Sequence, residues 1–237
     1  MENLPTYIGI VFGLTTLATV LIFYKSTTNS KTTLVVICSW LALQAFISLS
    51  GFYTVTNSLP PRLLFSVVPA MLFIFVLFVT AKGRQFIDSL DTKMLTILHI
   101  IRIPVEIVLF WLFVHKTVPQ IMTFEGRNFD ILSGITSPIV FYFGFIKKQL
   151  NRKVILLWNF ICLALLANIV VIALLSAPFP FQQFAFDQPN IAILYFPFIW
   201  LPCCVVPLVL LAHLVCIRQI INNKNTCNVK KTADTNE

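Results

Sequence analysis

"LTILHIIRIPVEIVLFWLFVH", residues 95–115, is apolar over the length of a membrane-spanning helix, yet it contains His99, Arg102 and Glu106. A helix needs about 20 mostly apolar residues to cross the roughly 30 Å of hydrocarbon in a bilayer. The whole sequence has the same character, because 58% of its 237 residues are hydrophobic and only 11% are charged. Soluble domains carry about 25% charged residues. The composition therefore predicts an all-α, multi-pass membrane protein.

Six further apolar segments are bounded by charged residues, prolines or polar clusters. Together with residues 95–115 they predict one domain, residues 1–220, built as a bundle of seven transmembrane helices. The polar stretch at residues 221–237 is too short for a domain, and we expect it to be a disordered tail. The predicted spans are Tyr7–Tyr24, Thr33–Tyr53, Leu63–Ala81, Leu95–His115, Ile131–Ile146, Val154–Ala177 and Ile191–Ile217.

The basic residues indicate how this bundle is oriented. Thirteen of the 17 Lys and Arg residues lie on one side of it, whereas Arg62, Lys116 and Arg127 lie on the other and Arg102 lies within the fourth span. Lys and Arg in short loops mark the cytoplasmic side, so we expect the N-terminus outside and the C-terminus in the cytoplasm of a cell membrane. Basic residues beside helix ends face anionic lipid headgroups. The net charge of +8 therefore indicates the lipid bilayer as a partner and gives no support for nucleic acid.

The ionisable residues of the fourth span form a stripe. At 100° per residue, His99, Arg102 and Glu106 fall within about 60° of one another on a helix. Such residues face a bundle interior or a water-filled cavity, because a charge at the membrane centre costs about 2.5 to 3.5 kcal/mol. Two interpretations stay open: the stripe binds a ligand, ion or substrate, or it is a structural clip in which Arg102 neutralises Glu106. Asn159, within the sixth span, could add polarity to a cavity, but an interhelical hydrogen bond is the expected role.

The seventh span contains a possible partner for the stripe. Pro197, Pro202 and Pro207 each interrupt helical hydrogen bonding, so this helix should be bent or partly unwound. His213 falls near the depth of His99. The two histidines could ligate a metal or haem or share a proton path, or each could simply bond a backbone carbonyl. The sequence leaves the cofactor content open.

The loop after the fourth span is a second candidate binding site. Its residues Glu125, Arg127, Asn128 and Asp130 alternate with phenylalanines around a glycine. This pattern predicts a turn or re-entrant loop, with Asn128 or Asp130 available as the N-cap of the fifth helix. The other long outer loop, residues 177–190, is rich in phenylalanine. The two loops together could cover an outward-facing cavity.

Several well-known protein classes fit the sequence poorly, and a zinc hydrolase stays a minor alternative. It has no P-loop, G-x-G-x-x-G, G-x-S-x-G or H-E-x-x-H motif. Its six cysteines show no C-x-x-C spacing and five of them lie in apolar runs, which is typical of packed side chains. No lysine lies in a predicted span, as a retinal Schiff base would require. The paired histidines that three-histidine membrane hydrolases carry in their last helix are also missing.

Three segments carry a resemblance to a known group. They are "RIPVEIVLFWLF" (102–113), "MTFEGRNFDILSGITSP" (122–138) and "QPNIAILYFPFIWLP" (188–202). Over roughly residues 95–215 the chain resembles an uncharacterised group of bacterial seven-helix integral membrane proteins. This resemblance implies a bacterial inner membrane location, and it implies no activity.

Three functions follow as hypotheses. The first is binding or transport of a small solute, lipid or ion through the intramembrane stripe. The second is a membrane-embedded enzyme acting on a lipid or lipid-linked substrate, in which Glu106 or Glu125 would be the acid or base and His99 or His213 a ligand or proton carrier. The third is a structural or assembly subunit whose polar groups only fix helix packing. The sequence names neither a ligand nor an oligomeric state.

Overall fold

The computed structural model describes the backbone of residues 4–233 and the side chains of residues 4–222. Within the described backbone all regular structure is helical and no strand occurs. The helices are α1 (Thr6–Ser26), α2 (Lys31–Leu49), η1 (Phe52–Thr54), α3 (Leu64–Val79), α4 (Ala81–Ser89), α5 (Thr92–Leu98), η2 (His99–Ile101), α6 (Arg102–Val114), η3 (Gln120–Met122), α7 (Ile131–Phe141), η4 (Tyr142–Ile146), α8 (Arg152–Leu175), η5 (Ala192–Leu194), η6 (Leu201–Val205) and α9 (Val206–Ala233). Of the short helices, η4 and η6 are π-helices and the others are 3₁₀-helices.

Many of these helices suit a membrane. Five are long and apolar enough to cross one, and a sixth span results if α3 and α4, which meet at an angle of 94°, are taken together. The segment Ile131–Ile146 is a shorter apolar helix with the bounds that the sequence predicts. The all-α prediction is confirmed, and the apolar helices support a membrane protein. The five long spans are Thr6–Ser26, Lys31–Leu49, Thr92–Val114, Arg152–Leu175 and Leu201–Asn222.

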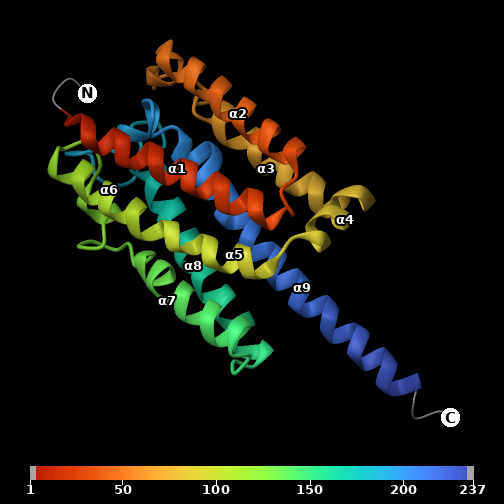
Figure 1. The fold of residues 1–237 in the computed structure, drawn as a ribbon. Coiled ribbons are helices and arrows are strands. Elements are labelled where there is room, and N and C mark those ends of the chain that lie inside the picture. Colours follow the sequence, from red (N-terminus) through yellow and green to blue (C-terminus); the bar gives the residue numbers. More distant parts are fainter. Residues whose placement is uncertain (1–3, 234–237) are drawn as a thin grey trace.

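The long helices run side by side, with α9 through the middle of the bundle (Figure 1). In the most apolar stretch of its span 61% of the residues are buried. The corresponding share for α2, which lies at the edge beside α3, is 11%. Helix α9 contacts α5, α8 and α3, while α7 packs against α5 and α6 on the opposite side from α2. The core therefore lies between α1, α5, α6, α8 and α9, and the outer faces remain apolar, as lipid contact requires.

The seventh predicted span needs correction at both ends. Its helix begins at Leu201 instead of Ile191, because the prolines around residue 200 cannot supply amide donors to a regular helix. The first turn is the π-helix η6, and Trp40 Nε1 donates to the Cys203 carbonyl at 3.0 Å. The helical backbone continues to Ala233, whereas the sequence predicts a disordered tail from residue 221. Residues 221–233 contain no proline or glycine to end the helix, and residues 234–237 lie outside the described part.

The fourth predicted span is one continuous helical rod with a local change of winding. Helices α5 and α6 are joined by η2, a single 3₁₀ turn at His99–Ile101. Pro104 follows it at the third position of α6 and removes an amide donor that would bond back to this turn. The altered winding therefore coincides with the ionisable stripe.

Candidate functional site

The ionisable stripe of α5–α6 and the loop before α7 form one site. Arg102 Nη1 lies 2.6 Å from Asp130 Oδ1 in an ion pair. One turn further along α6, Glu106 Oε1 accepts a hydrogen bond of 2.6 Å from Asn128 Nδ2. The sequence places these residues in two separate candidate sites, and the structure brings four of them together. The clip between Arg102 and Glu106 is replaced by two pairs that each join α6 to the loop.

His213 of α9 and Asn159 of α8 complete the network. Arg102 Nη2 lies 3.0 Å from His213 Nε2, and His213 Nδ1 lies 2.9 Å from Asn159 Oδ1. The Asn159 amide nitrogen donates to the Ile155 carbonyl, so its oxygen is the acceptor for the ring. A guanidinium can only donate. His213 is therefore a neutral imidazole with its proton on Nδ1 and its Nε2 lone pair toward Arg102.

His99 extends the network toward the α5 end by ring contacts. Its imidazole stacks on that of His213 with 3.8 Å between ring centroids and 14° between planes. Trp158 of α8 meets His99 edge to face at 5.6 Å, and its indole N–H donates to Thr136 Oγ1 of α7 at 2.9 Å. Helices α8 and α9 thus both contact His99, and α7 holds Trp158 in place. We call His99, Arg102, Glu106, Asn128, Asp130, Asn159 and His213 the polar cluster.

The polar cluster is closed to solvent. None of its members is more than 5% exposed. Arg102 and Asp130 balance each other's charge, whereas Glu106 forms no ion pair with any described cation. Neither of the two cavities outlined in the structure is lined by members of the cluster. The site is therefore a buried group of ionisable side chains, in which Glu106 has no counter-ion among the described residues.

Four polar atoms of the cluster have no hydrogen-bond partner among the described residues. They are both ring nitrogens of His99, Arg102 Nε and Glu106 Oε2. An unsatisfied buried polar group costs about 1 to 3 kcal/mol. Packing alone would favour a network in which every member is satisfied. The two ends of the cluster, His99 and Glu106, thus retain free capacity to hold a proton or a ligand.

A close approach of α7 to α6 brings Asp130 to Arg102. A Cβ atom added to Gly134 would lie 2.8 Å from Ile103 Cγ1 and 3.1 Å from Ile103 N. Small residues at such positions let two helices come together inside a membrane. The Asp130 amide donates to Asn128 Oδ1 at 3.0 Å. Asp130 occupies the N-cap position of α7 without capping it, so its carboxylate is free to pair with Arg102.

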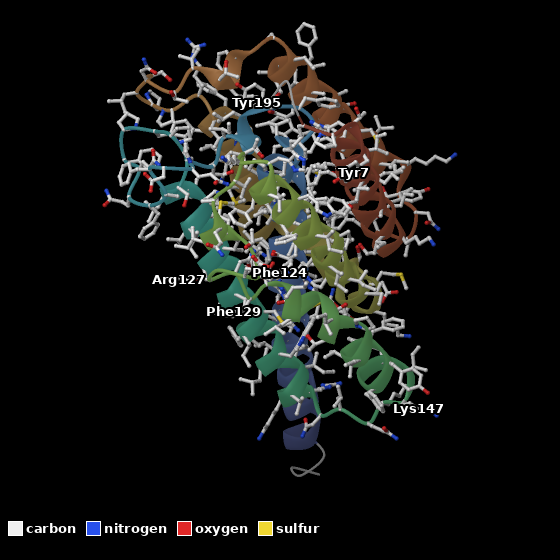
Figure 2. All side chains as sticks on the ribbon, turned by 90° about the vertical axis from the view of Figure 1, so that its left-hand side faces the viewer. Tyr7, Phe124, Arg127, Phe129, Lys147 and Tyr195 are labelled. Carbon is white, nitrogen blue, oxygen red and sulfur yellow. The ribbon has the colours of Figure 1, made fainter. Side chains whose placement is uncertain are left out.

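The remaining residues of the outer-loop candidate site point away from the cluster. Glu125 and Arg127 are exposed. Phe124, Arg127 and Phe129 lie roughly halfway along the bundle between Tyr195 and Lys147 (Figure 2). This depth fits the predicted re-entrant loop. Irregular backbone at membrane depth needs partners within the protein, and Asn128 provides one by donating to the Met122 carbonyl at 2.9 Å.

The geometry gives limited support to a metal at His99 and His213. In the described part of the chain, no group of three or more His, Cys, Asp or Glu side chains is arranged to hold a metal ion. Both nitrogens of His213 already have partners in the network. Stacked rings also do not direct their nitrogen lone pairs at a common point. Metal ligation by His99 and His213 thus stays a prediction, and the arrangement suits proton exchange.

Sequence reasoning overlooked Trp158 as part of the site and did not include Asn159 among the candidate site residues. Trp158 contacts both His99 and His213, with ring centroids 5.6 and 5.9 Å away. The adjacent Asn159, an amide inside an otherwise apolar helix, was the available signal.

Comparison with known families matches a region of the chain that contains the whole polar cluster. Residues 59–221, from just before α3 into α9, match the family described as Domain of unknown function (DUF8737). The chain has no significant match among curated proteins or among solved structures. Because the matched region covers more than half of the chain, the protein belongs to this family, DUF8737.

Proposed function

We propose that the protein is a seven-span membrane protein, with its N-terminus outside and its C-terminus in the cytoplasm, that binds and transports a small ion or solute through the polar cluster. The ion that the cluster favours is the proton. A location in a bacterial inner membrane is part of the proposal and rests on the resemblance of residues 95–215. The ligand site consists of the polar cluster and not of the exposed part of the loop.

The arrangement of the helices supports the seven-span topology. Along the chain α1, α2, α3, α5–α6, α7, α8 and α9 alternate in direction (Figure 1). The α3–α4 corner with Lys82 and the α7–α8 turn with Lys147 then lie at the same end of the bundle as the outgoing end of α9. A bundle with its basic turns at one end suits the positive-inside rule.

One observation carries the proposed activity: besides Arg102 Nε at its centre, the polar cluster has unpartnered polar atoms at both of its ends. Glu106 Oε2 is free toward the outer end, and both nitrogens of His99 are free toward the inner end. The two residues are seven positions apart, or about 10 Å along a helix. Between them lie the Arg102–Asp130 pair and the His213 ring. A proton-exchanging group thus stands on either side of a charged centre.

Each of these groups has the chemistry that proton exchange requires. A proton on Glu106 Oε2 cancels the carboxylate charge while Oε1 still accepts from Asn128. Neutral His99 has one ring nitrogen to accept a proton and one to donate it. Intramembrane carboxylates and histidines of this kind form the proton relays of pumps and transporters. Arg102 keeps Asp130 ionised and orients His213, and both stay in place as the proton moves.

Proton flux into vesicles tests this proposal. The full chain is reconstituted into liposomes that contain a pH-sensitive dye, and a pH gradient is imposed with potassium and valinomycin holding the membrane potential. We expect flux above that of protein-free vesicles, and a loss of at least tenfold in Glu106→Gln. Glu125→Gln, which changes an exposed carboxylate in the loop before α7, is the matched control and should keep the flux. Wild-type flux equal to protein-free vesicles, or unchanged flux in Glu106→Gln, contradicts the proposal.

A further inference from the structure

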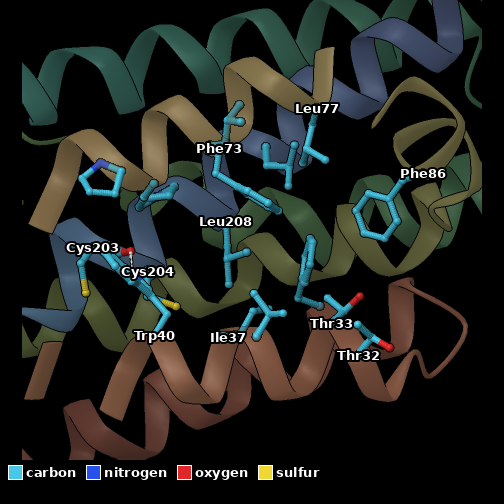
Figure 3. A pocket seen from close by; sticks show the side chains of 17 residues that line it. Thr32, Thr33, Ile37, Trp40, Phe73, Leu77, Phe86, Cys203, Cys204 and Leu208 are labelled. Carbon is cyan, nitrogen blue, oxygen red and sulfur yellow. Dashed lines mark hydrogen bonds between the residues drawn. The ribbon is translucent and has the colours of Figure 1, made fainter. Parts of the chain in front are cut away.

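A cavity of about 420 Å³ lies between α2 and α3, away from the polar cluster. Its floor is formed by η6 and α9, and its walls are almost entirely apolar (Figure 3). Both α2 and α3 contact η6, which keeps the two helices apart at the cavity. Its lining includes Thr33, Ile37, Trp40, Phe73, Cys204 and Leu208. None of these residues takes part in the proposed proton path.

The cavity opens sideways, toward the surroundings of the bundle. Val36 of α2 and Phe73 of α3 line it and are nevertheless 52% and 55% exposed. In a membrane-spanning bundle this lateral opening faces hydrocarbon. The cavity volume falls in the range of small-molecule sites, about 300 to 1,000 Å³. Its occupant must therefore be apolar along most of its length and must enter from the bilayer.

The shape of the cavity is held by specific contacts. Trp40 donates its indole N–H to the Cys203 carbonyl, which ties α2 to the π-helical turn at one end. Pro69 of α3 and Pro207 of α9 line the cavity, and each removes an amide donor from its own helix there. From Thr33 to Trp40 the cavity extends for about 10 Å along α2. It is long enough to take a stretch of hydrocarbon chain.

The end of the cavity at the first turn of α2, which we call its mouth, is polar and lies among basic residues. Thr32 and Thr33 line it at the first turn of α2, directly after the exposed Lys31. Phe86 of α4 lines the same end (Figure 3), and Lys82 lies four residues before it, on the same face of α4. Basic residues at a membrane surface attract anionic headgroups by about 1 kcal/mol each. The cavity is thus apolar inside and positively charged at its entrance.

We propose that this cavity binds one acyl chain of an anionic glycerophospholipid, with the phosphate of the headgroup at Lys31 and Lys82. The chain passes between Thr33 and Phe86 and ends near Trp40 and Cys204. The assignment rests on the chain spanning a bilayer, and it is independent of proton movement. A tightly held lipid at this position fills the space between α2 and α3 and fixes the otherwise exposed α2 against the bundle.

Photo-crosslinking tests the lipid site. The full chain is placed in nanodiscs with phosphatidylglycerol that carries a diazirine near the end of one acyl chain, and labelled residues are mapped by mass spectrometry. Phosphatidylcholine with the same chain and the free fatty acid with the same chain are the comparison probes. We expect phosphatidylglycerol to label the lining residues, Ile37 and Leu208 among them, at least fivefold more than either probe. Equal labelling by all three probes, or labelling confined to outward residues such as Leu72 and Phe75, overturns the proposal.

Two pairs of variants assign the effect to the cavity and to its entrance. Ala70→Phe fills the cavity and should abolish labelling of the lining, whereas Val68→Phe, on the exposed face of α3, should not. Lys31→Gln with Lys82→Gln should lower phosphatidylglycerol labelling to the level of phosphatidylcholine. Lys147→Gln with Lys153→Gln removes two exposed charges at the same end, one in the α7–α8 turn and one in the first turn of α8, and should leave labelling unchanged. The charge variants keep the test decisive if Ala70→Phe fails to fold, and unchanged labelling in them refutes the headgroup site.

Discussion

Arg102 holds the polar cluster together. Its guanidinium reaches Asp130, His213 and the Cys162 carbonyl, at 2.6, 3.0 and 3.4 Å, and so links α6 to α8, α9 and the loop before α7. The side chain of a helical residue leans toward the helix N-terminus. Arg102 therefore points toward His99 and His213, away from Glu106 four residues later. The counter-charge for Arg102 therefore comes from Asp130 and not from Glu106, its i, i+4 neighbour.

A double-mutant comparison distinguishes the two candidate partners of Arg102. Arg102→Leu leaves Asp130 as a buried unpaired charge, and breaking a buried pair in this way costs about 3 to 5 kcal/mol. Adding Asp130→Asn should recover part of the lost thermal stability in detergent, because the unpaired charge is then removed. Adding Glu106→Gln to Arg102→Leu should recover none of it. Rescue by Glu106→Gln and not by Asp130→Asn would show that Arg102 is paired with Glu106.

At the scale of elements, the contact between α6 and α7 positions the site. Gly134 packs against Ile103 and Arg102 at a separation that leaves no room for a methyl group. On the next turn, Ser137 Oγ donates to the Thr96 carbonyl of α5 at 2.9 Å. The small residues of α7 thus set its distance from the α5–α6 rod. That distance decides whether Asp130 reaches Arg102.

Substituting Gly134 by alanine should separate these elements. The added Cβ must displace Ile103 or move α7, and overpacking of this kind costs about 1 to 3 kcal/mol. We expect lower thermal stability and reduced proton flux in Gly134→Ala. Gly13→Ala is the matched control, because a Cβ added to Gly13 meets no atom within 4 Å and alanine is the better helix former by about 1 kcal/mol. Equal stability in the two variants would show that α7 does not need this close approach.

An ion pair outside the apolar core fastens the C-terminal end of α4 to α9. Arg218 Nε lies 2.8 Å from Asp88 Oδ1. The hydrogen bond from Arg218 lowers the pKa of Asp88 below its ordinary value of 3.8. Because the folded-state pKa is the lower one, the pair stabilises the fold above about pH 4 and loses this contribution as the pH falls through the folded pKa.

The pH dependence of a single variant tests this fastening. The Asp88 side chain is 41% exposed, and exposed pairs contribute at most about 1 kcal/mol. Asp88→Asn should therefore unfold at a slightly lower temperature than the parent at pH 7, and the difference should shrink as the pH falls below about 4. Asp187→Asn, at an exposed loop carboxylate, should match the parent at pH 7. A difference for Asp88→Asn that grows toward pH 3 would contradict the assigned pair.

At the scale of the whole molecule, two different kinds of site share one helix. Helix α9 places His213 in the polar cluster and Leu208, one and a half turns earlier, in the apolar cavity. The cluster lies toward α5, α6, α7 and α8, and the cavity lies toward α2 and α3 (Figure 1). The family region, residues 59–221, contains the whole cluster but omits α2. One wall of the cavity thus comes from outside the family region.

Cysteine labelling tests the proposed orientation of the whole molecule. In a background with the native cysteines replaced, Asp187→Cys should react with an impermeant maleimide added to intact cells. Lys147→Cys should react only after the membrane is permeabilised, because the α7–α8 turn lies on the proposed cytoplasmic side. Both positions are exposed in the structure. Reaction of Lys147→Cys in intact cells, with protection of Asp187→Cys, would require the opposite orientation.

The sequence by itself determined the all-helical class, the apolar segments and the stripe of His99, Arg102 and Glu106. These features depend on hydrophobicity and on the 100° rotation per residue, which are local properties of the chain. The prolines of the last span likewise predicted its partial unwinding, observed as η6. The start of that helix was predicted at residue 191 and lies at residue 201. The error arose because residues 191–200 are as apolar as the helix itself, although they do not form a regular α-helix.

Only the tertiary structure decided the partners within the site. Arg102 pairs with Asp130 across 28 residues and with His213 across 111, and no local rule sets such distances in sequence. They depend on α7 approaching α6 at Gly134 and on the rotation of α8 and α9 that turns Asn159 and His213 inward. The cavity between α2 and α3 is likewise a property of packing, since it exists where two helices are held apart by the π-helical turn between them. Helix formation is local, whereas the choice among buried polar partners is made when the helices assemble.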